Sequence, residues 1–389
     1  MYIFGEQVFI KQYDMVARTL TERIKKTLFS GKAVIVLGAR QTGKTTLLKS
    51  VVENQPEVLN LNCDEPIVRS QLQDVNLAEL KKVIGEKKLI FIDEAQRVRN
   101  IGLTLKLITD NFKEVQLLAS GSSALDLASE FKESLAGRKR DYHLYPLSWA
   151  ELAEHEGYLQ AKAQLQNRVV YGMYPEVITS PGEEEELLYE LTDSYLYKDL
   201  LSFEGIRKPE ILSKLVQALA LQIGSEVSYN ELSQIVGADK NTVSSYIDLL
   251  EKTFVIFKLP AYSTNARNEL SRKKKIYFHD TGVRNAVIGN FSPLDMRTDK
   301  GALWENFLLS ERMKMLGNNR IRAGMYFWRS VNQTEVDYVE KRGQQLLAFE
   351  FKWSSKAKKK KPRAFLNNYD AKLSFVDSEN FTSFLSQDK

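Results

Sequence analysis

The first part of the chain alternates short, continuous apolar runs with amphipathic stretches. The apolar runs cover residues 33–37, 89–93 and 115–120, and each has the length of a strand buried on both faces of a sheet. Residues 58–63 are also predicted to form a short strand. Apolar residues at helical spacing follow over 46–52 and recur over 77–84. Strands that alternate with crossover helices predict an α/β domain whose parallel sheet is covered by helices on both faces.

A different pattern begins near residue 209, where short amphipathic segments replace the apolar runs. Helical spacing is present over 212–223, and further helices are predicted to begin near Ser228 and Asn241, with a turn over 237–240 between them. An apolar strand over 254–259 and a basic stretch follow. This order is typical of a helix-turn-helix module with a wing.

The predicted recognition helix of this module has a polar face. Lys240, Asn241, Thr242 and Ser245 would face a groove if the module reads DNA. Because this face is not rich in arginine, we do not expect strong sequence specificity. Winged helices in ring ATPases also serve as packing modules, so a role without DNA stays open.

Toward the C-terminus, a predicted helix at 301–309 is followed by predicted strands at 326–328, 335–339 and 346–352. Asp337 and Glu350-x-Lys352 have the spacing of a PD-(D/E)xK nuclease core, and Glu305 supplies an acidic residue on the preceding helix. Alternation places Glu350 and Lys352 on one face of their strand. Asp337 and Glu350 are therefore candidate Mg²⁺ ligands, and Lys352 would steady the nucleophilic water or the scissile phosphate. Such cores are also retained as inactive binding domains, so cleavage and binding both stay open.

The turn after the first apolar run carries Gly38-Ala39-Arg40-Gln41-Thr42-Gly43-Lys44-Thr45, followed by Thr46. This is the full spacing of a Walker A phosphate loop between a strand and a helix. Its glycines let backbone amides turn toward phosphates, and the helix N-terminus adds positive potential. Lys44 would neutralise the β- and γ-phosphates and Thr45 would bind Mg²⁺, so residues 38–46 predict ATP binding.

The apolar run at 89–93 ends in Asp93 and is followed by Glu94, which is the Walker B pattern. The carboxyl end of a parallel strand is where an α/β sheet places its ligands. Asp93 would hold the magnesium shell, and Glu94 would polarise the attacking water as a general base. Together with the phosphate loop, this pair predicts ATP hydrolysis.

Candidate polar groups follow the next strand. Ser122 or Ser123 would hold the lytic water in the position called sensor 1, although polar residues also end strands for turn reasons alone. Arg138, in a run of basic residues, is the candidate cation for the γ-phosphate of the same or a neighbouring subunit. A finger that acts across a subunit boundary requires an oligomer.

Composition limits the class of protein. The chain has 389 residues, of which 43% are hydrophobic and 27% charged, so two or three soluble domains are expected. No apolar run approaches the roughly 18 residues needed to span a bilayer, and no signal-like segment is recognised, so we expect a cytoplasmic protein without a membrane partner. Cys63 is the only cysteine, which excludes an intrachain disulfide, and we expect it to be buried at a strand end.

The net charge of +5 is unevenly distributed along the sequence. Basic clusters lie over 267–275 and 356–363, whereas residues 183–186 are four consecutive glutamates. Lysine-rich stretches are more often solvated surface, but clusters of this kind also bind nucleic-acid phosphates. The candidate phosphate contacts are Lys273, Lys274, Lys358 and Lys359.

An ordered set of motifs extends over nearly the whole chain, at residues 38–45, 91–96, 119–123, 135–138, 143–148, 171–176, 195–199 and 279–282. The set resembles a prokaryotic family of AAA-type ATPases in which the ATPase domain is joined to a C-terminal domain of long-unassigned function with a nuclease-like core. The resemblance implies an AAA-type ATPase domain over 1–150, a helical lid or connector over 151–208, a winged-helix-like domain over 209–280 and a restriction-endonuclease-like α/β domain over 281–389.

These patterns lead to one principal hypothesis and two alternatives. We expect a homo-oligomer, with a ring as one arrangement, that binds ATP and ADP with Mg²⁺, hydrolyses ATP, and couples nucleotide state to DNA binding or DNA processing. The first alternative is a nucleotide-dependent switch whose C-terminal domain binds DNA or protein without catalysis. The second is a transcriptional regulator, which the weak recognition face disfavours.

Overall fold

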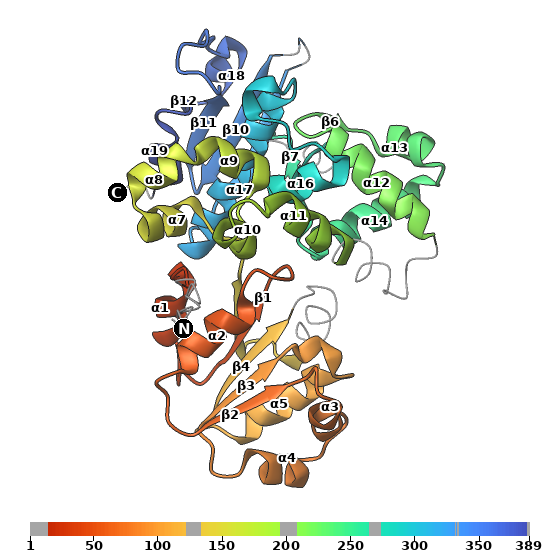
Figure 1. Cartoon of the computed structure of the whole chain (residues 1–389), viewed down its shortest axis with the longest axis vertical. Coiled ribbons are helices and arrows are strands. Elements are labelled where there is room, and N and C mark those ends of the chain that lie inside the picture. Colours follow the sequence, from red (N-terminus) through yellow and green to blue (C-terminus); the bar gives the residue numbers. More distant parts are fainter. Residues whose placement is uncertain are drawn as a thin grey trace, which may run out of the picture.

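The computed structural model describes residues 15–121, 134–194, 208–263, 274–330, 332 and 334–386. Two lobes are visible in Figure 1: an N-terminal lobe up to residue 143 and a C-terminal lobe from residue 149 onward. The segment 144–148 joins them, and we call it the connecting segment.

The N-terminal lobe is built on one five-stranded sheet with the order β2-β3-β4-β1-β5. All neighbouring strands in it are parallel. The strands are β1 (Ala33–Leu37), β2 (Val58–Asn62), β3 (Leu89–Asp93), β4 (Gln116–Gly121) and β5 (Lys139–His143). Four of them lie where the sequence predicted strands, and the parallel arrangement is confirmed.

Helices cover both faces of this sheet, because the strand residues alternate between two apolar layers. Ile35 and Leu37 pack with one set of helices, and Val34 and Val36 pack with the other. The first set consists of α3 (Pro66–Leu72), α4 (Leu77–Ile84) and α5 (Ile101–Asn111), and the second of α1 (Thr19–Lys25) and α2 (Lys44–Val52). The prediction of a doubly covered sheet is confirmed.

The edge strand β5 was not predicted, because its sequence does not look like a buried strand. Lys139, Arg140, Asp141 and His143 are only partly buried or exposed, and Tyr142 alone is buried. Charged residues are common on edge strands, where they prevent pairing with other chains. The basic run around Arg138 is therefore the beginning of an edge strand.

The C-terminal lobe begins with a series of helices. They are α7 (Trp149–Glu156), α8 (Tyr158–Ala163), α9 (Leu165–Tyr171), α10 (Pro175–Thr179) and α11 (Glu184–Thr192), of which α9 and α11 pack against α16 (Thr281–Ile288) (Figure 1). Asp280 joins these elements, because its carboxylate accepts hydrogen bonds from the Met173 and Val283 amides at 2.7 and 3.1 Å. A Cβ on Gly172, whose φ is +75°, would lie 2.0 Å from Asp280 Oδ1. The motifs at 171–176 and 279–282 thus form a packing junction.

Three helices and a small antiparallel sheet follow. The helices are α12 (Pro209–Leu221), α13 (Tyr229–Val236) and α14 (Lys240–Lys252), and the strands are β6 (Glu226–Val227), β7 (Ile256–Pro260) and β8 (Lys274–Phe278). The sheet has the order β6-β8-β7. The helix positions agree with the expected ranges within a few residues.

The tail contains a second, four-stranded sheet with the order β12-β11-β10-β9. It follows α17 (Lys300–Asn318) and consists of β9 (Gly324–Arg329), β10 (Glu335–Arg342), β11 (Gln345–Phe351) and β12 (Lys372–Val376), with α18 (Arg363–Asn368) and α19 (Phe381–Leu385) beside it. The first three strands are antiparallel, and β12 runs parallel to β11.

Both faces of β11 are covered, because nearly every residue of that strand is buried. Phe349 and Phe351 belong to the apolar cluster that includes α17 and α19, whereas Leu346 and Ala348 pack with Phe365 of α18. Successive residues of β11 therefore point into two apolar layers, one on each face of the sheet.

Aromatic rings fill the space where the lobes meet. The His279 ring lies 5.7 Å from the Tyr145 ring and 5.2 Å from the Phe257 ring, and His143 lies edge-on to Phe254 at 5.4 Å. Burial lowers the pKa of His279 to about 3, and the nearby charge of Lys314 and the His143 ring act in the same direction. His279 is therefore neutral in the folded protein.

We expect the free energy of unfolding to decrease as the pH falls from 6.5 toward about 3. The unfolded chain gains a proton at His279 over this interval and the folded chain does not, which corresponds to about 1.4 kcal/mol per pH unit. Denaturant unfolding of His279→Phe, which keeps a ring without a titrating group, should show a correspondingly smaller pH dependence.

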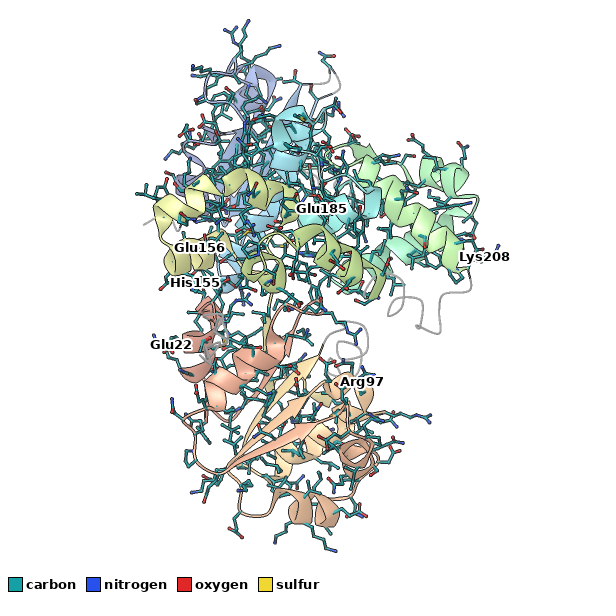
Figure 2. The ribbon with its side chains drawn as sticks, viewed as in Figure 1. Glu22, Arg97, His155, Glu156, Glu185 and Lys208 are labelled. Atoms are coloured by element: carbon teal, nitrogen blue, oxygen red, sulfur yellow. The ribbon has the colours of Figure 1, made fainter. Side chains whose placement is uncertain are left out.

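His155→Gln is the matched control, because His155 is exposed on α7 in the C-terminal lobe (Figure 2). It should retain the pH dependence of the unaltered chain. If the free energy of unfolding of His279→Phe kept the pH dependence of the unaltered chain, another group would be responsible for it.

Candidate functional site

The loop between β1 and α2 has the backbone that close approach to phosphates requires. Gly43 has a φ of +89° and Gln41 a φ of +56°, both in the left-handed region. Glycine adopts this region freely, whereas glutamine does so at a cost of about 1–2 kcal/mol. The Thr42 hydroxyl donates to the Ala39 carbonyl at 2.9 Å and holds the turn from inside.

Lys44 lies over this loop. Its side chain is 5% exposed, and Nζ donates to the Gly38 and Ala39 carbonyls at 3.2 and 2.7 Å. Burial lowers the pKa of Lys44 to about 8, while the carboxylates of Glu94 and Asp93 act in the opposite direction. An ammonium in contact with neutral carbonyls has lost most of its hydration, so phosphate oxygens are stronger partners for it.

Side chains from α2, β3 and β4 meet beside the loop. The Thr45 hydroxyl donates to Asp93 Oδ1 at 3.1 Å, and the Ser120 hydroxyl donates to the same oxygen. The Glu94 amide donates to Ser120 Oγ at 3.0 Å, and Gln96 Nε2 donates to Glu94 Oε2 at 2.6 Å. Hydroxyl and carboxylate oxygens are the ligands that Mg²⁺ prefers, so Thr45 and Asp93 fit this ion.

Ser120 and Gln96 were missed by the sequence analysis. Ser120 is fully buried in β4, next to β3 in the sheet. A serine within an otherwise apolar strand was the available signal, since a buried hydroxyl needs a partner. The predicted sensor residues Ser122 and Ser123 lie outside the described residues, so this part of the site stays a prediction.

The connecting segment lies directly against the phosphate loop. The Leu144 amide donates to the Leu37 carbonyl at 2.7 Å and so extends the pairing of β5 with β1. A Cβ on Gly38 would lie 2.1 Å from the Leu144 carbonyl oxygen. Gly38 is thus required for the contact with the protein's own backbone.

Arg18 joins the loop to the C-terminal lobe, and its role was not predicted from the sequence. Its guanidinium donates to the Thr42 and Tyr145 carbonyls, both at 2.7 Å, and Nε lies 3.3 Å from Glu151 Oε1. Glu151 also accepts from the Thr19 amide at 2.8 Å and caps α7 with Ser148. One arginine therefore contacts the loop, the connecting segment and α7.

The prediction that Arg138 reaches the γ-phosphate of its own subunit was wrong. The Arg138 carbonyl accepts from the Ala33 amide, so Arg138 lies at the amino end of β5 and β1. The phosphate loop lies at the opposite end of these strands, about 16 Å away for a five-residue strand. Arg138 Nε instead contacts Asp110 Oδ1 at 2.5 Å. Contact of Arg138 with the nucleotide of a neighbouring subunit stays a prediction.

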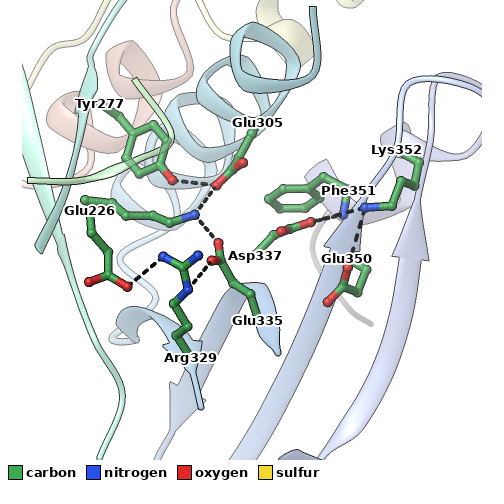
Figure 3. A network of polar contacts seen from close by, with 10 residues as sticks. Glu226, Tyr277, Glu305, Arg329, Glu335, Asp337, Glu350, Phe351 and Lys352 are labelled. Atoms are coloured by element: carbon green, nitrogen blue, oxygen red, sulfur yellow. Dashed lines mark hydrogen bonds and ion pairs between the residues drawn. The ribbon is translucent and has the colours of Figure 1, made fainter. Parts of the chain in front are cut away.

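A second group of charged side chains lies in the C-terminal lobe, and Figure 3 shows it. Asp337 and Glu350 are brought together, because β10 and β11 pair in the register Tyr338 with Phe349. Lys352 Nζ lies 3.9 Å from Asp337 Oδ2 and 3.6 Å from Glu350 Oε2. The Phe351 amide donates to Asp337 Oδ2 at 2.7 Å.

This group extends beyond the predicted residues. Lys275 of β8 contacts Glu305 at 3.1 Å and also contacts Glu335, and Arg329 links Glu335 to Glu226 at 3.3 and 2.9 Å. Tyr277 donates to Glu305 at 2.5 Å. We call the carboxylates of Glu305, Glu335, Asp337 and Glu350 the carboxylate network.

Burial changes the acidity of these groups. It raises the pKa of Glu305 to about 7, and the Lys275 charge opposes that shift. It raises the pKa of Glu350 to about 8, and the nearby Asp337 carboxylate adds to the shift. The pKa of Lys275 is raised because these acids outweigh its burial. Positive charge is therefore strongly favoured at this position.

The remaining nucleic-acid candidates are distributed over separate elements. Lys240 and Asn241 are exposed at the start of α14, and Thr242 and Lys274 are half-buried. The Thr242 hydroxyl donates to Asp239 Oδ2 at 2.5 Å. Lys358 is exposed after β11, whereas Lys359 contacts Asp377 at 3.3 Å. Lys273 lies outside the described residues.

Two absences apply to the described part of the chain. Within it, no helix combines the length and the apolar character that crossing a membrane requires. In the same residues, no group of three or more His, Cys, Asp or Glu side chains is arranged to hold a metal ion. Cys63 is buried directly after β2 as expected, and burial raises the pKa of its thiol to about 12.

Comparison with protein families divides the chain into three matched parts. Residues 30–153 match the family model described as AAA domain. Residues 162–294 match a domain of unknown function (DUF8612), and residues 300–383 match another domain of unknown function (DUF4143). The chain therefore contains an AAA-type P-loop ATPase domain joined to a C-terminal domain without an assigned function, which confirms that part of the resemblance.

Two relatives match most of this chain. The chain is 29% identical over 345 residues to an uncharacterized protein of Mycobacterium tuberculosis, covering 87% of this chain and 74% of the relative. It is 24% identical over 339 residues to an uncharacterized protein of Haemophilus influenzae, covering 80% of each. Among solved structures, it is similar to a Walker-type ATPase of Pyrococcus abyssi, with a TM-score of 0.49 at 15% identity over 71% of this chain and 97% of that one.

We expect Gly38→Ala to weaken the contact between the phosphate loop and the connecting segment. The added Cβ meets a backbone oxygen at 2.1 Å, which no side-chain rotation relieves, so the loss should be about 2 kcal/mol or more. Chemical denaturation and a fluorescent-nucleotide titration would measure the loss in stability and in affinity.

Gly301→Ala is the matched control, because nothing lies within 4 Å of a Cβ at that exposed helical position. It should be neutral or stabilising by up to about 1 kcal/mol. Equal behaviour of the two variants would contradict the close approach.

Proposed function

We propose that this protein binds ATP with Mg²⁺ and hydrolyses it at the phosphate loop. The observation that carries the proposal is the meeting of Thr45, Asp93 and Ser120 through one carboxylate oxygen, next to buried Lys44 and Glu94. Such an arrangement joins a phosphate-binding cation, metal-binding oxygens and a carboxylate base at the carboxyl ends of neighbouring parallel strands.

Each residue has a separate role in this proposal. Lys44 exchanges its bonds to the Gly38 and Ala39 carbonyls for bonds to the β- and γ-phosphates, while Thr45 and Asp93 hold the Mg²⁺ shell. The ion, when bound, neutralises the charge that develops on the phosphate oxygens. Glu94 takes a proton from the attacking water as the bond from the γ-phosphorus to its bridging oxygen breaks, which gives ADP and phosphate. Gln96 orients the Glu94 carboxylate.

Lys44→Ala should abolish nucleotide turnover, and Glu94→Gln should keep ATP binding but hydrolyse about 10²- to 10⁴-fold more slowly. The first variant loses the phosphate-binding cation, and the second keeps the shape of the side chain without its basicity. Phosphate release and nucleotide affinity should be measured on the same preparations.

Lys49→Ala is the control, since Lys49 is exposed on the same helix and should not affect turnover. Normal turnover in Lys44→Ala and Glu94→Gln would remove the assignment of the site.

We propose further that the C-terminal lobe contacts DNA and that nucleotide state controls this contact. The order of α12, α13, α14 and the β6-β8-β7 sheet supports a winged-helix module, with Lys240 and Asn241 exposed at the start of its third helix. This helix is expected to read DNA sequence weakly, because some of its polar groups are already bonded within the protein. Thr242 donates to Asp239, and Asp248 pairs with Lys258. Backbone contact with DNA is therefore the mode that the proposal favours.

A nuclease-like core in the tail is the second part of this proposal. Asp337 and Glu350 offer carboxylate oxygens from adjacent strands, and Mg²⁺ uses one or two carboxylates with water as the remaining ligands. Lys352 lies within 4 Å of both, where it would hold a nucleophilic water or a phosphate. The exposed lysines from residue 356 to 361 follow directly and would contact the DNA backbone.

If the core cleaves DNA, cutting should require Mg²⁺ and should disappear in Asp337→Ala and Lys352→Ala. The change removes a metal ligand in the first case and the charge that steadies the water or phosphate in the second. Supercoiled, linear and single-stranded DNA should be tested with and without ATP.

Asp370→Ala and Lys341→Ala change exposed residues of the same domain and serve as controls. Cleavage of no DNA form by the unaltered protein would favour the alternative, in which the core binds DNA or protein and acts as a nucleotide-controlled switch.

Native mass with ATP and with ADP would test the proposed homo-oligomer and the role of Arg138 across a subunit boundary.

A further inference from the structure

Lys275 is a buried cation that reaches the carboxylate network from another module of the lobe. Its side chain is 2% exposed and comes from β8 of the small β6-β8-β7 sheet, whereas the network belongs to α17, β10 and β11. Nζ contacts Glu305 at 3.1 Å and also contacts Glu335 (Figure 3). A lysine is almost never buried to this degree unless acids surround it.

The surroundings fix Lys275 in this position. Tyr277, two residues further along β8, donates to the same Glu305 oxygen at 2.5 Å. Lys275 Nζ also lies 5.4 Å from the centre of the Phe327 ring, which adds a cation–π contact. Arg329 contacts the other oxygen of Glu335 at 3.3 Å. These contacts keep Lys275 from turning toward solvent.

The ammonium of Lys275 lies near the proposed metal ligands Asp337 and Glu350, but it contacts other carboxylates of the network. Glu335 and Asp337 are two residues apart on β10, Asp337 is near enough to act electrostatically on Lys275, and Glu350 is on the adjacent strand. Lys275 thus contacts Glu305 and Glu335, while Asp337 and Glu350 face Lys352. The network is divided into two halves: Lys275 and Arg329 contact one half, and Lys352 contacts the other.

We propose that Lys275 supplies the positive charge that a second metal ion would otherwise bring to the carboxylate network, so that the tail binds a single divalent cation at Asp337 and Glu350. Sites that hold two metals place them about 3.5–4 Å apart. The ammonium of Lys275 contacts Glu305 and Glu335, the carboxylates of the network that would be left to hold a second ion. The inference rests on the proposed metal site in the tail.

The experiment counts bound Mn²⁺ per chain by electron paramagnetic resonance of the free ion, without nucleotide. All variants carry Asp93→Asn, so that the ATPase site does not contribute. The background chain should bind one ion. Lys275→Gln, which keeps a hydrogen-bond donor without the charge, should bind two ions.

Three further variants complete the test. Lys275→Met, which keeps an uncharged stem over Phe327, should also bind two ions, so either folded uncharged variant decides the question. Lys275→Arg keeps the charge and should bind one. Lys275→Gln/Glu305→Gln removes a ligand of the new position and should return the number to one.

The outcomes separate this inference from the proposed function. If a folded uncharged variant binds the same number of ions as the background, the role of Lys275 is overturned while the site at Asp337 and Glu350 stands. If the background binds none and the uncharged variants gain one, Lys275 excludes a metal as proposed and the site at Asp337 and Glu350 fails. If no variant binds Mn²⁺, both are overturned.

Discussion

The contact between Gly38 and the Leu144 carbonyl is the constraint on which the two lobes depend. Because the first residue of the phosphate loop has no side chain, the chain leaving β5 passes directly over the loop at a distance that any Cβ would prevent. Arg18 strengthens the same contact by binding the loop carbonyl of Thr42 and the connecting-segment carbonyl of Tyr145. The loop that meets phosphate is therefore packed against the segment that leads to the C-terminal lobe, and neither can shift without the other.

The connecting segment is held from its other side by α17. Lys314 donates to the Leu147 carbonyl at 2.9 Å, and Glu311 accepts from the Trp149 amide at 2.6 Å and pairs with Lys314. These charges are almost fully buried, so breaking one partner leaves the other unpaired at a cost of about 3–5 kcal/mol. Glu305, about 14 Å from Lys314 along the same helix, belongs to the carboxylate network. One rigid helix thus touches both the segment over the phosphate loop and the proposed output site.

The sequence was sufficient for elements whose chemistry is local. A continuous apolar run, a glycine-rich turn and two terminal carboxylates predicted β1, the phosphate loop, β3 and the pair Asp93 and Glu94, because each signal lies within a few residues. Asp337, Glu350 and Lys352 were also found, since strand pairing follows from a short hairpin. The strand β5 was missed because its charges are those of a solvated segment. Lys275 was missed because nothing local separates it from half-buried Lys274, and only packing of β8 against α17 buries it.

Three of the residues that sequence reasoning missed share one property, which bears on the coupling proposed between the lobes. Arg18, Ser120 and Lys275 each bond groups from elements that are distant in sequence, and each replaces hydration by bonds that exist only in the folded chain. Such groups carry no periodic signal in the sequence. Arg18 joins the phosphate loop to the connecting segment, and α17 contacts that segment and carries Glu305, so buried contacts lead from the loop to the carboxylate network. Nucleotide-dependent movement of the phosphate loop would act first on Arg18 and Leu144, then on the connecting segment, and then on α17. Because α17 also carries Glu305, the balance between Lys275 and the carboxylates is where a change at the nucleotide would arrive.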